Sequence, residues 1–313
     1  MPNHKVLIAD SLAESGKQIL LAETELDDRA GISPEELLEI IPAYNALIVR
    51  GRTKVTREVI EAGKNLAVVG RAGVGVDNID LAAAQASNVI VVNSPTATTT
   101  AVVEHTFALL LSMLRRIPQA DATMKTGQWE KKALQGAELY GKTLGIIGMG
   151  RIGAQVGQVA AGFGMTILGY DPLIPADTIS QRGAEPVSLH DLYARADVIS
   201  LHLPLNNETR NMIDGEALSA MKRGVYLVCA ARGGIIDETA LLARLDSGQV
   251  AGAALDVFAQ EPPGLTALVA HPLVTAAPHI GAQTHEAQER ASQHIAEEII
   301  RALKGEELFW QVV

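Results

Sequence analysis

The sequence predicts an α/β protein with two doubly wound parallel sheets. Short apolar runs bounded by Gly, Asp, Asn and Pro alternate with amphipathic stretches, which is typical of buried parallel strands joined by helices. The runs form two groups, one before residue 95 and one after residue 140. A length of 313 residues is enough for roughly two domains.

The first group of apolar runs predicts the strands of one sheet. They are Lys5–Ala9, Ala46–Val49, Leu66–Val69 and Val89–Val92. Between the first two runs we expect a helix over residues 34–41, because Ser33 is a typical N-cap residue and Pro34 is favoured in a first turn.

The second group predicts another sheet of the same kind. Its strands are Thr143–Ile147, Met165–Gly169, Val198–Leu201, Val225–Val228 and Gly252–Leu255. Parallel strands need crossover connections and usually bury both faces under helices. Longer helical patterns cover residues 98–116, which link the two groups, and residues 286–304.

Composition excludes several classes of partner. The net charge of −10 argues against a nucleic acid or an anionic membrane surface, and no metal-binding motif stands out. Cys229, the single cysteine, lies in an apolar run, so we expect a reduced packing residue rather than a catalytic thiol. The N-terminus runs into a short apolar strand without a signal-peptide core, which predicts a cytoplasmic protein.

The strongest local signal is an apolar strand followed by Gly148, Gly150 and Gly153 in a Gly-x-Gly-x-x-Gly pattern, with a helical stretch over residues 154–161. The glycines permit a tight turn, close approach to a pyrophosphate and close helix packing. The pattern therefore predicts a dinucleotide site, with Arg151 at the pyrophosphate. The alternative is an ordinary glycine-rich turn with Arg151 in solvent.

An acidic residue follows at the spacing expected for a ribose contact. Asp171 ends the next strand, 18 residues after Gly153. Its charge would repel the 2′-phosphate of NADP, so we expect NAD. The alternative is that Asp171 only caps the turn that begins at Pro172.

Three polar residues further along suit hydride-transfer chemistry. Arg232, Glu261 and His279 each follow a strand-like run, at the carboxyl edge where open α/β sheets bind ligands. Histidine exchanges protons near neutral pH, a carboxylate orients its ring, and arginine binds carboxylates. Taken singly, each residue also has an ordinary structural interpretation. Arg232 could hold a loop together through hydrogen bonds, Glu261 could be a solvated acid before a Pro-Pro turn, and His279 could be a capped histidine in a loop.

Together these motifs resemble the D-isomer-specific 2-hydroxyacid dehydrogenase family over nearly the whole chain. The segments that carry the resemblance are 49–55, 70–80, 93–95, 148–153, 202–205, 231–234, 253–258, 261–263 and 278–281. The resemblance implies an NAD-binding Rossmann domain, residues 96–284, inserted in a flavodoxin-like substrate domain formed by residues 1–95 and 285–313.

The resemblance also implies roles for individual residues. By the family's pattern Arg232 binds the substrate carboxylate and carbonyl oxygen, His279 exchanges the hydroxyl proton, and Glu261 pairs with His279. Expected cofactor contacts are Val74, Gly148, Gly150, Arg151, Ile152, Gly153, Asp171, Leu203, Ala230, Asp256, Ile280, Gly281 and Ala282. Expected substrate contacts are Arg50, Gly51, Arg52, Gly73, Gly75 and Asn93.

Two positions depart from the family pattern. Gly51 stands where a serine often follows the arginine, and Cys229 stands where an asparagine is common. A phosphorylated substrate would need concentrated positive charge, for which Arg50 and Arg52, with Lys131 and Lys132, are candidates. The alternative is a pair of ordinary surface arginines.

The resemblance implies oxidation of D-3-phosphoglycerate to 3-phosphohydroxypyruvate, the first step of serine synthesis. The alternatives are a reductase of glyoxylate or hydroxypyruvate, another D-2-hydroxyacid dehydrogenase, and, more remotely, an NAD-sensing transcriptional co-regulator. The family suggests a homodimer formed through the region of residues 98–116. Because the chain ends soon after its last helix, we expect no C-terminal regulatory domain.

Overall fold

The computed structural model describes residues 4–313, which divide into two compact units. Unit 1 consists of Met1–Thr100 and Ala282–Val313, and unit 2 is Ala101–Gly281. One unit is therefore continuous and the other is built from both ends of the chain. The domain boundaries predicted from the sequence, which divide the chain into residues 1–95, 96–284 and 285–313, stay a prediction.

Unit 1 contains a five-stranded parallel sheet in the order β2-β1-β3-β4-β5. Its strands are β1 (Lys5–Ile8), β2 (Glu25–Asp28), β3 (Ala46–Val49), β4 (Val68–Arg71) and β5 (Ile90–Asn93). Its helices are α1 (Glu14–Leu21), α2 (Pro34–Ile40), the 3-10 turn η1 (Ile41–Ala43), α3 (Arg57–Ala62), α4 (Leu81–Ala86) and α12 (His285–Lys304). Ser33 caps α2, and its hydroxyl accepts a hydrogen bond from the Glu36 N–H, as predicted.

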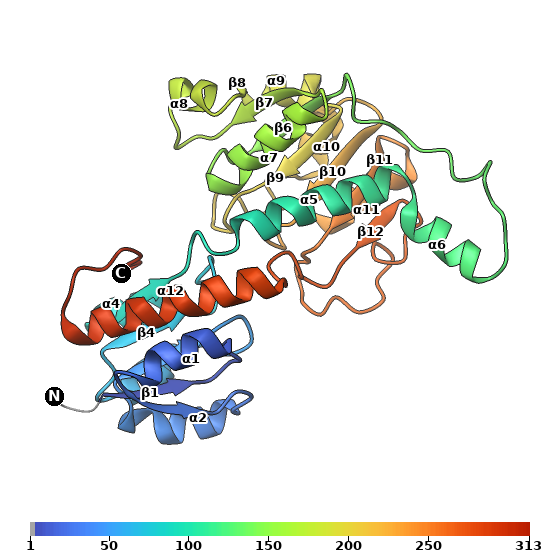
Figure 1. Cartoon of the computed structure of the whole chain (residues 1–313). Coiled ribbons are helices and arrows are strands. Elements are labelled where there is room, and N and C mark those ends of the chain that lie inside the picture. The colour runs from blue at the N-terminus through green and yellow to red at the C-terminus, as the bar shows by residue number, and fades with distance from the viewer. Residues whose placement is uncertain (1–3) are drawn as a thin grey trace. The chain divides into compact units, whose positions relative to one another are not determined.

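Helices cover both faces of this sheet because alternate strand residues point to opposite sides. Leu7, Leu47 and Val69 pack with α2, α3 and α4 in one core cluster. Ile8 and Ile48 face α1 and the apolar side of α12, and α1 and α12 lie side by side along the sheet (Figure 1). Helix α12 begins at a side-chain cap, since the Thr284 hydroxyl accepts the Ala287 N–H.

Unit 2 contains a seven-stranded parallel sheet in the order β12-β11-β10-β9-β6-β7-β8. Its strands are β6 (Thr143–Ile147), β7 (Thr166–Tyr170), β8 (Glu185–Pro186), β9 (Val198–Leu201), β10 (Val225–Cys229), β11 (Val250–Leu255) and β12 (Val274–Ala276). Its helices are α5 (Thr99–Leu114), α6 (Ile117–Lys125), α7 (Arg151–Gly162), α8 (Ala176–Gln181), α9 (Leu189–Arg195), α10 (Gly215–Ala220) and α11 (Glu238–Asp246). Helix α5 begins two residues before the unit boundary.

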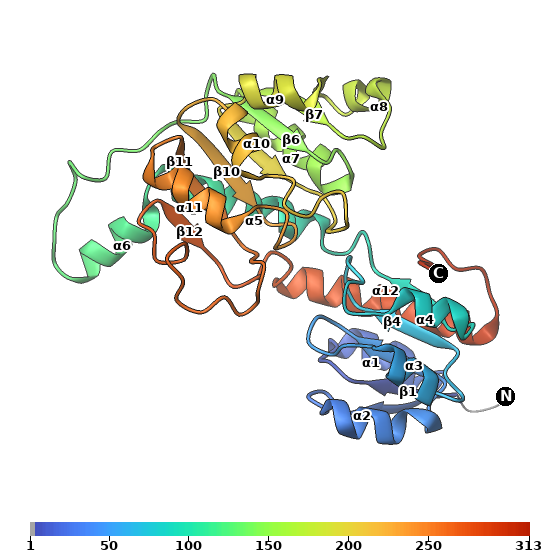
Figure 2. The ribbon, with the colours of Figure 1, turned by 180° about the vertical axis from the view of Figure 1, so that it is seen from behind.

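Two core clusters fill the faces of this sheet. Helices α5, α7 and α8 pack on one face, and α9, α10 and α11 pack on the other, which Figure 2 shows from behind. Cys229 is buried in the second cluster as a free thiol, and burial raises its pKa to about 11. This agrees with the prediction of a packing residue.

Helix α6 and the segment that follows it extend away from the sheet of unit 2 in both views (Figures 1 and 2). Helix α6 has no buried residue, and Ile117, Met124 and Trp129 expose 52%, 56% and 77% of their surface. No helix within residues 4–313 is both long and apolar enough to cross a membrane.

Three strands were not predicted. Strand β2 has the sequence Glu-Leu-Asp-Asp and lies at the edge of its sheet, where charged side chains reach solvent and no apolar run is needed. Strands β8 and β12 have only two and three residues. The run predicted at Leu66–Val69 is also displaced, because pairing with β3 begins at Val68 and continues to Arg71.

Candidate active site

The glycine-rich loop of unit 2 has the geometry of a phosphate-binding turn. Gly148 has a φ of 98°, a left-handed conformation that favours glycine. A Cβ on Gly153 would lie 2.0 Å from the Gly148 carbonyl oxygen, so only glycine allows this packing. A Cβ on Gly150 would meet nothing within 4 Å, which leaves the backbone open to a ligand at the N-terminus of α7.

Asp171 ties this loop to the end of β7. Its Oδ2 accepts a hydrogen bond of 2.9 Å from the Met149 N–H, and its Oδ1 accepts one of 2.9 Å from the Leu173 N–H. The turn-capping alternative from the sequence is therefore present. A carboxylate can accept further hydrogen bonds, so the ribose contact stays a prediction.

Arg232, Glu261 and His279 follow three neighbouring strands of the same sheet. They come after β10, β11 and β12 respectively, and these strands pair side by side in register. Because the strands are parallel, all three residues lie at the carboxyl edge, the same edge as the glycine-rich loop after β6. The Arg232 guanidinium donates a 2.6 Å hydrogen bond to the Ala231 carbonyl oxygen.

Glu261 and His279 contact each other directly. The Nδ1 atom of His279 lies 2.7 Å from Oε2 of Glu261, and the other carboxylate oxygen accepts the Phe258 N–H at 3.1 Å. Burial raises the pKa of Glu261, but the His279 and Phe258 hydrogen bonds outweigh it and hold that pKa below 4.5. Glu261 is therefore an anion near neutral pH, and the Nε2 atom of His279 is left to exchange a proton with a ligand.

A buried aspartate organises the loop that carries His279. The Asp256 carboxylate accepts the N–H groups of Ile280 and Gly281 at 2.9 and 2.8 Å, and its backbone carbonyl accepts the His279 N–H at 2.8 Å. Asp256 is 1% exposed. The sequence predicted a cofactor contact here, whereas the described contacts of Asp256 are with this loop and with His105, which the sequence did not single out.

The remaining predicted cofactor residues of unit 2 also lie near strand ends. Ile152 and Arg151 start α7, Leu203 follows β9, and Ala230 follows β10. Next to Leu203, burial lowers the pKa of His202 to about 4, so this imidazole is neutral where its Nε2 atom meets the Ser200 hydroxyl at 2.8 Å.

In unit 1 the predicted substrate loop after β3 is closed by two side chains. The Asp10 carboxylate accepts the N–H groups of Arg50 and Thr53 at 2.7 and 3.2 Å, and the Thr53 hydroxyl at 2.7 Å. From the other side, the Asn78 amide donates to the Arg50 and Thr53 carbonyl oxygens at 3.0 and 2.7 Å. The sequence analysis missed Asp10, although an acid directly after a buried strand is the same signal that identified Asp171.

The two arginines of this loop have different surroundings. Arg52 donates to the Asp10 carboxylate and to the carbonyl oxygens of Ala9 and Ile32. Arg50 donates to the neutral oxygens of Ser11 and Gln283, both at 3.2 Å. Burial lowers the pKa of Arg50 while Asp10 opposes the shift. The half-buried Arg50 is thus the better candidate to bind an anion, and Arg52 mainly closes the loop.

The other predicted unit 1 residues surround the ends of β4 and β5. Gly73 has a φ of 150°, and a Cβ there would collide with the Arg71 guanidinium. The Asn93 amide donates to the Val74 carbonyl oxygen at 2.6 Å. Gly75 follows in the same loop, and Ala282, the last predicted cofactor contact, accepts a hydrogen bond from the Gln288 amide through its carbonyl oxygen.

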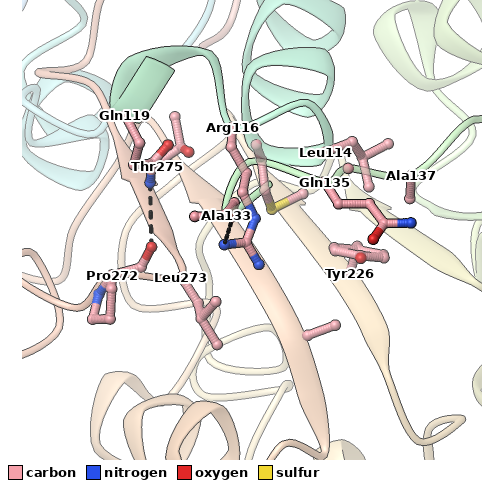
Figure 3. Close-up of a pocket in the computed structure, with 13 residues that line it drawn as sticks. Leu114, Arg116, Gln119, Ala133, Gln135, Ala137, Tyr226, Pro272, Leu273 and Thr275 are labelled. Carbon is pink, nitrogen blue, oxygen red and sulfur yellow. Dashed lines mark hydrogen bonds between the residues drawn. The ribbon is translucent and has the colours of Figure 1, made fainter. Parts of the chain in front are cut away.

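A pocket of about 440 Å³ in unit 2 lies away from all of these residues (Figure 3). It opens at the opposite edge of the sheet, because Tyr226, Ala251 and Leu273 lie at the amino ends of β10, β11 and β12. Its walls are closed by hydrogen bonds from Gln119 to the Pro272 carbonyl and from Arg116 to the Ala133 carbonyl. None of its lining residues belongs to the predicted site.

Comparison with known proteins decides the family. Residues 107–281 match the NAD binding domain of the D-isomer specific 2-hydroxyacid dehydrogenases. The chain belongs to this family. Unit 2 is its NAD-binding domain, in agreement with the open glycine-rich loop at the N-terminus of α7.

Family members of several kinds are similar to the chain. D-3-phosphoglycerate dehydrogenase 2, chloroplastic, from Arabidopsis thaliana is 48% identical over 308 residues, which cover 98% of this chain and 49% of that protein. The D-3-phosphoglycerate dehydrogenase of Methanocaldococcus jannaschii is 48% identical over 96% of this chain and 58% of its own length. The chain thus spans about half the length of these relatives.

Solved structures of the family share the whole fold. The crystal structure of a glyoxylate reductase from Paecilomyes thermophila is 32% identical with a TM-score of 0.92, covering 100% of this chain and 99% of that one. The TT0316 protein of Thermus thermophilus is 34% identical with a TM-score of 0.89, covering 99% of this chain and 100% of that one. The two-sheet α/β fold predicted from the sequence is confirmed.

Proposed function

We propose that this chain oxidises D-3-phosphoglycerate to 3-phosphohydroxypyruvate. The observation that carries the proposal is the 2.7 Å contact between Glu261 and His279 at the sheet edge that also bears the glycine-rich loop. The identity of 43–48% to D-3-phosphoglycerate dehydrogenases of plants, archaea, bacteria and animals supports the choice of substrate.

The proposed mechanism assigns proton transfer and orientation to the protein. NAD, when bound, accepts the hydride from the substrate C2 atom. Neutral His279 takes the hydroxyl proton at Nε2, and the Glu261 carboxylate at Nδ1 stabilises the imidazolium that results. The Arg232 guanidinium binds the substrate carboxylate and the oxygen that becomes the carbonyl.

In unit 1 we propose that Arg50 binds the substrate phosphate, and that Gly73, Gly75 and Asn93 contact its carboxylate. The cation of Arg50 is held among neutral partners, Ser11 and Gln283, which favours an anionic ligand. Lys131 and Lys132 remain candidates for additional positive charge. Gly51 and Arg52 would contribute through the shape of the loop.

The test is a steady-state panel in which D-3-phosphoglycerate, D-glycerate and D-lactate are each oxidised with NAD or NADP. In the reverse direction, glyoxylate and hydroxypyruvate are each reduced with NADH or NADPH. We expect the highest kcat/KM for D-3-phosphoglycerate with NAD. Arg50→Ala should raise the KM for D-3-phosphoglycerate by about 10–100-fold, since a charge-assisted hydrogen bond is lost, and leave that for D-glycerate within about threefold. Arg57→Ala, on the surface of α3, is the control.

Two variants separate binding from chemistry. Arg52→Ala should raise the KM for phosphorylated and unphosphorylated acids alike, because its contacts close the loop, while sparing NAD binding. His279→Ala should lower kcat far more than NAD affinity, and near-normal turnover in this variant would reject its role as the base.

A glyoxylate or hydroxypyruvate reductase is the second candidate. The likeness to a glyoxylate reductase over the full length favours it. Preference for an unphosphorylated acid in the panel would decide for it. An NAD-sensing co-regulator would instead bind a protein partner and show no turnover with any acid.

We further propose a homodimer in the cytoplasm. The predicted interface over residues 98–116 corresponds largely to α5, most of which is buried in the core of unit 2. The exposed apolar side chains of α6 and Trp129 are therefore the better contact surface for a second copy. Sedimentation equilibrium measures the assembly, and cell fractionation measures the location.

A further inference from the structure

His105 lies against the buried carboxylate of Asp256 although it belongs to an apolar helix. Its Nε2 atom is 3.0 Å from Asp256 Oδ1, and the two side chains are 16% and 1% exposed. Its neighbours in α5, Val102 and Leu109, are buried apolar residues. A mostly buried imidazole is costly without a polar neighbour, and the Asp256 carboxylate lies within ion-pair distance of it.

Asp256 in turn binds three consecutive N–H groups of one loop. Oδ1 accepts the Ile280 N–H, Oδ2 accepts the Gly281 N–H, and the backbone carbonyl accepts the His279 N–H. His279 has a φ of 53°, a left-handed conformation that is unfavourable for a non-glycine residue. These three hydrogen bonds hold the peptide in that conformation and so set the direction of the imidazole.

The carboxylate performs this task only while it is ionised and keeps its rotamer. Burial works to raise the pKa of Asp256, but His105 and the two amide N–H groups outweigh it and lower that pKa. Oδ1 contacts both the His105 ring and the Ile280 N–H, so His105 packs against the carboxylate from the side of α5.

We propose that His105 is a positioning residue, which holds the Asp256 carboxylate against the loop of residues 279–281 and thereby aims His279. This inference rests on the proposed function, because it assumes that His279 exchanges the substrate proton. The contact of His105 is with Asp256, so we expect it to act through that carboxylate. Its loss should therefore affect the chemical step rather than the binding of the acid.

Two variants and a matched control test the proposal. His105→Leu fills the same apolar space without a polar atom. His105→Gln keeps a nitrogen donor near the position of Nε2. Thr106→Val is the control, since Thr106 is the next residue of α5, is 1% exposed, and among the described residues its hydroxyl bonds only the Val102 carbonyl.

The first measurement is amide hydrogen exchange at Ile280 and Gly281, which requires no substrate. We expect about tenfold faster exchange in His105→Leu, a rate within about threefold of the parent in His105→Gln, and no change in Thr106→Val. The second measurement is kcat and KM with NAD and D-3-phosphoglycerate. In His105→Leu we expect kcat to fall about tenfold with the acid's KM within about threefold, and His105→Gln to recover most of the loss.

Unchanged exchange at residues 280 and 281 in His105→Leu overturns the proposal, as does a kcat equal to that of the parent. If the parent turns over none of the acids in the panel, the proposed function fails instead, and the exchange rates alone decide whether His105 holds the loop. Should His105→Leu fail to fold, His105→Asn replaces it, because its shorter side chain cannot reach Asp256.

Discussion

Removal of the Asp10 carboxylate should loosen the predicted substrate loop and weaken unit 1 without affecting unit 2. Asp10 is 5% exposed and accepts the N–H groups of Arg50 and Thr53 and the Thr53 hydroxyl. In Asp10→Ala these three donors lose their acceptor. At about 1 kcal/mol for each, the free energy of unfolding of unit 1 should fall by about 3 kcal/mol.

The ion pair between Asp10 and Arg52 adds little to this figure. The Arg52 side chain is 52% exposed, and solvent screens such a pair. The functional consequence is carried by Arg50, whose N–H loses its carboxylate acceptor, so that among the described residues only the Asn78 amide still binds its backbone. We therefore expect the KM for D-3-phosphoglycerate to rise about tenfold, while NAD affinity stays unchanged because the glycine-rich loop belongs to unit 2.

The two tryptophans allow unit 1 to be followed separately. Trp310 belongs to unit 1, where its N–H donates to Glu298, and Trp129 belongs to unit 2. In a Trp129→Phe background, urea unfolding monitored by fluorescence reports on unit 1 through Trp310. Glu25→Gln is the control, because Glu25 is 54% exposed in a surface pair with Lys5 and its loss should cost less than about 0.5 kcal/mol.

A loss of less than about 1 kcal/mol in Asp10→Ala would contradict this expectation, because it would mean that water or a neighbouring group replaces the carboxylate. A tenfold rise in KM together with unaltered stability would also count against it, since both effects are expected from the loss of the same three hydrogen bonds.

Three further variants test the cofactor loop and the C-terminal segment. Gly153→Ala places a Cβ 2.0 Å from the Gly148 carbonyl and should weaken NADH binding at least about tenfold. Gly162→Ala, on the same helix, meets nothing within 4 Å and should leave NADH binding intact. Equal NADH binding in the two variants, measured by NADH fluorescence, contradicts the loop assignment. Asp171→Ala should improve kcat/KM with NADP relative to NAD, and an equal loss with both cofactors would mean that the residue only caps the turn. Glu298→Ala removes the 2% exposed carboxylate that accepts the Phe309 and Trp310 N–H groups, and it should lower the free energy of unfolding by about 2 kcal/mol. An unshifted Trp310 emission and an unchanged melting temperature would show that the C-terminal segment is held by its pairing with β5 instead.

The sequence predicted the apolar strands well and the charged ones poorly, for a physical reason. A strand buried on both faces consists almost wholly of apolar residues, so Ala46–Val49 and Val198–Leu201, which has one serine, were identified with their observed bounds. Strand β2 carries charges and is defined by its pairing with β1, where Lys5 lies opposite Glu25. Pairing between segments 20 residues apart leaves no periodic pattern in either one.

In the candidate site, too, some residues were identified from the sequence and others only from the folded structure. Glu261 and His279 were recognised because each follows a strand and belongs to a familiar motif, and the structure brings them together. His105 was not, because its contact with Asp256 depends on which face of α5 meets the sheet. Arg52 was recognised by its charge, but charge alone does not reveal that its donors are used by Asp10 and two carbonyl groups.

Asp10, Asp171 and Asp256 have one structural role in common. Each stands one or two residues after a parallel strand, and each accepts at least one N–H group from the loop that follows the neighbouring strand, namely the loops after β3, β6 and β12. Beyond the last strand residue the ladder no longer pairs these N–H groups, and a buried donor without an acceptor is costly. An aspartate at the end of the adjacent strand reaches these N–H groups with two acceptor oxygens. A glutamate is longer by one methylene group, and an asparagine has one acceptor oxygen fewer, so both fit these positions less well. The three loops bound in this way are those that carry Arg50, the glycine-rich turn and His279, so this aspartate pattern coincides with the loops for which ligand binding is proposed.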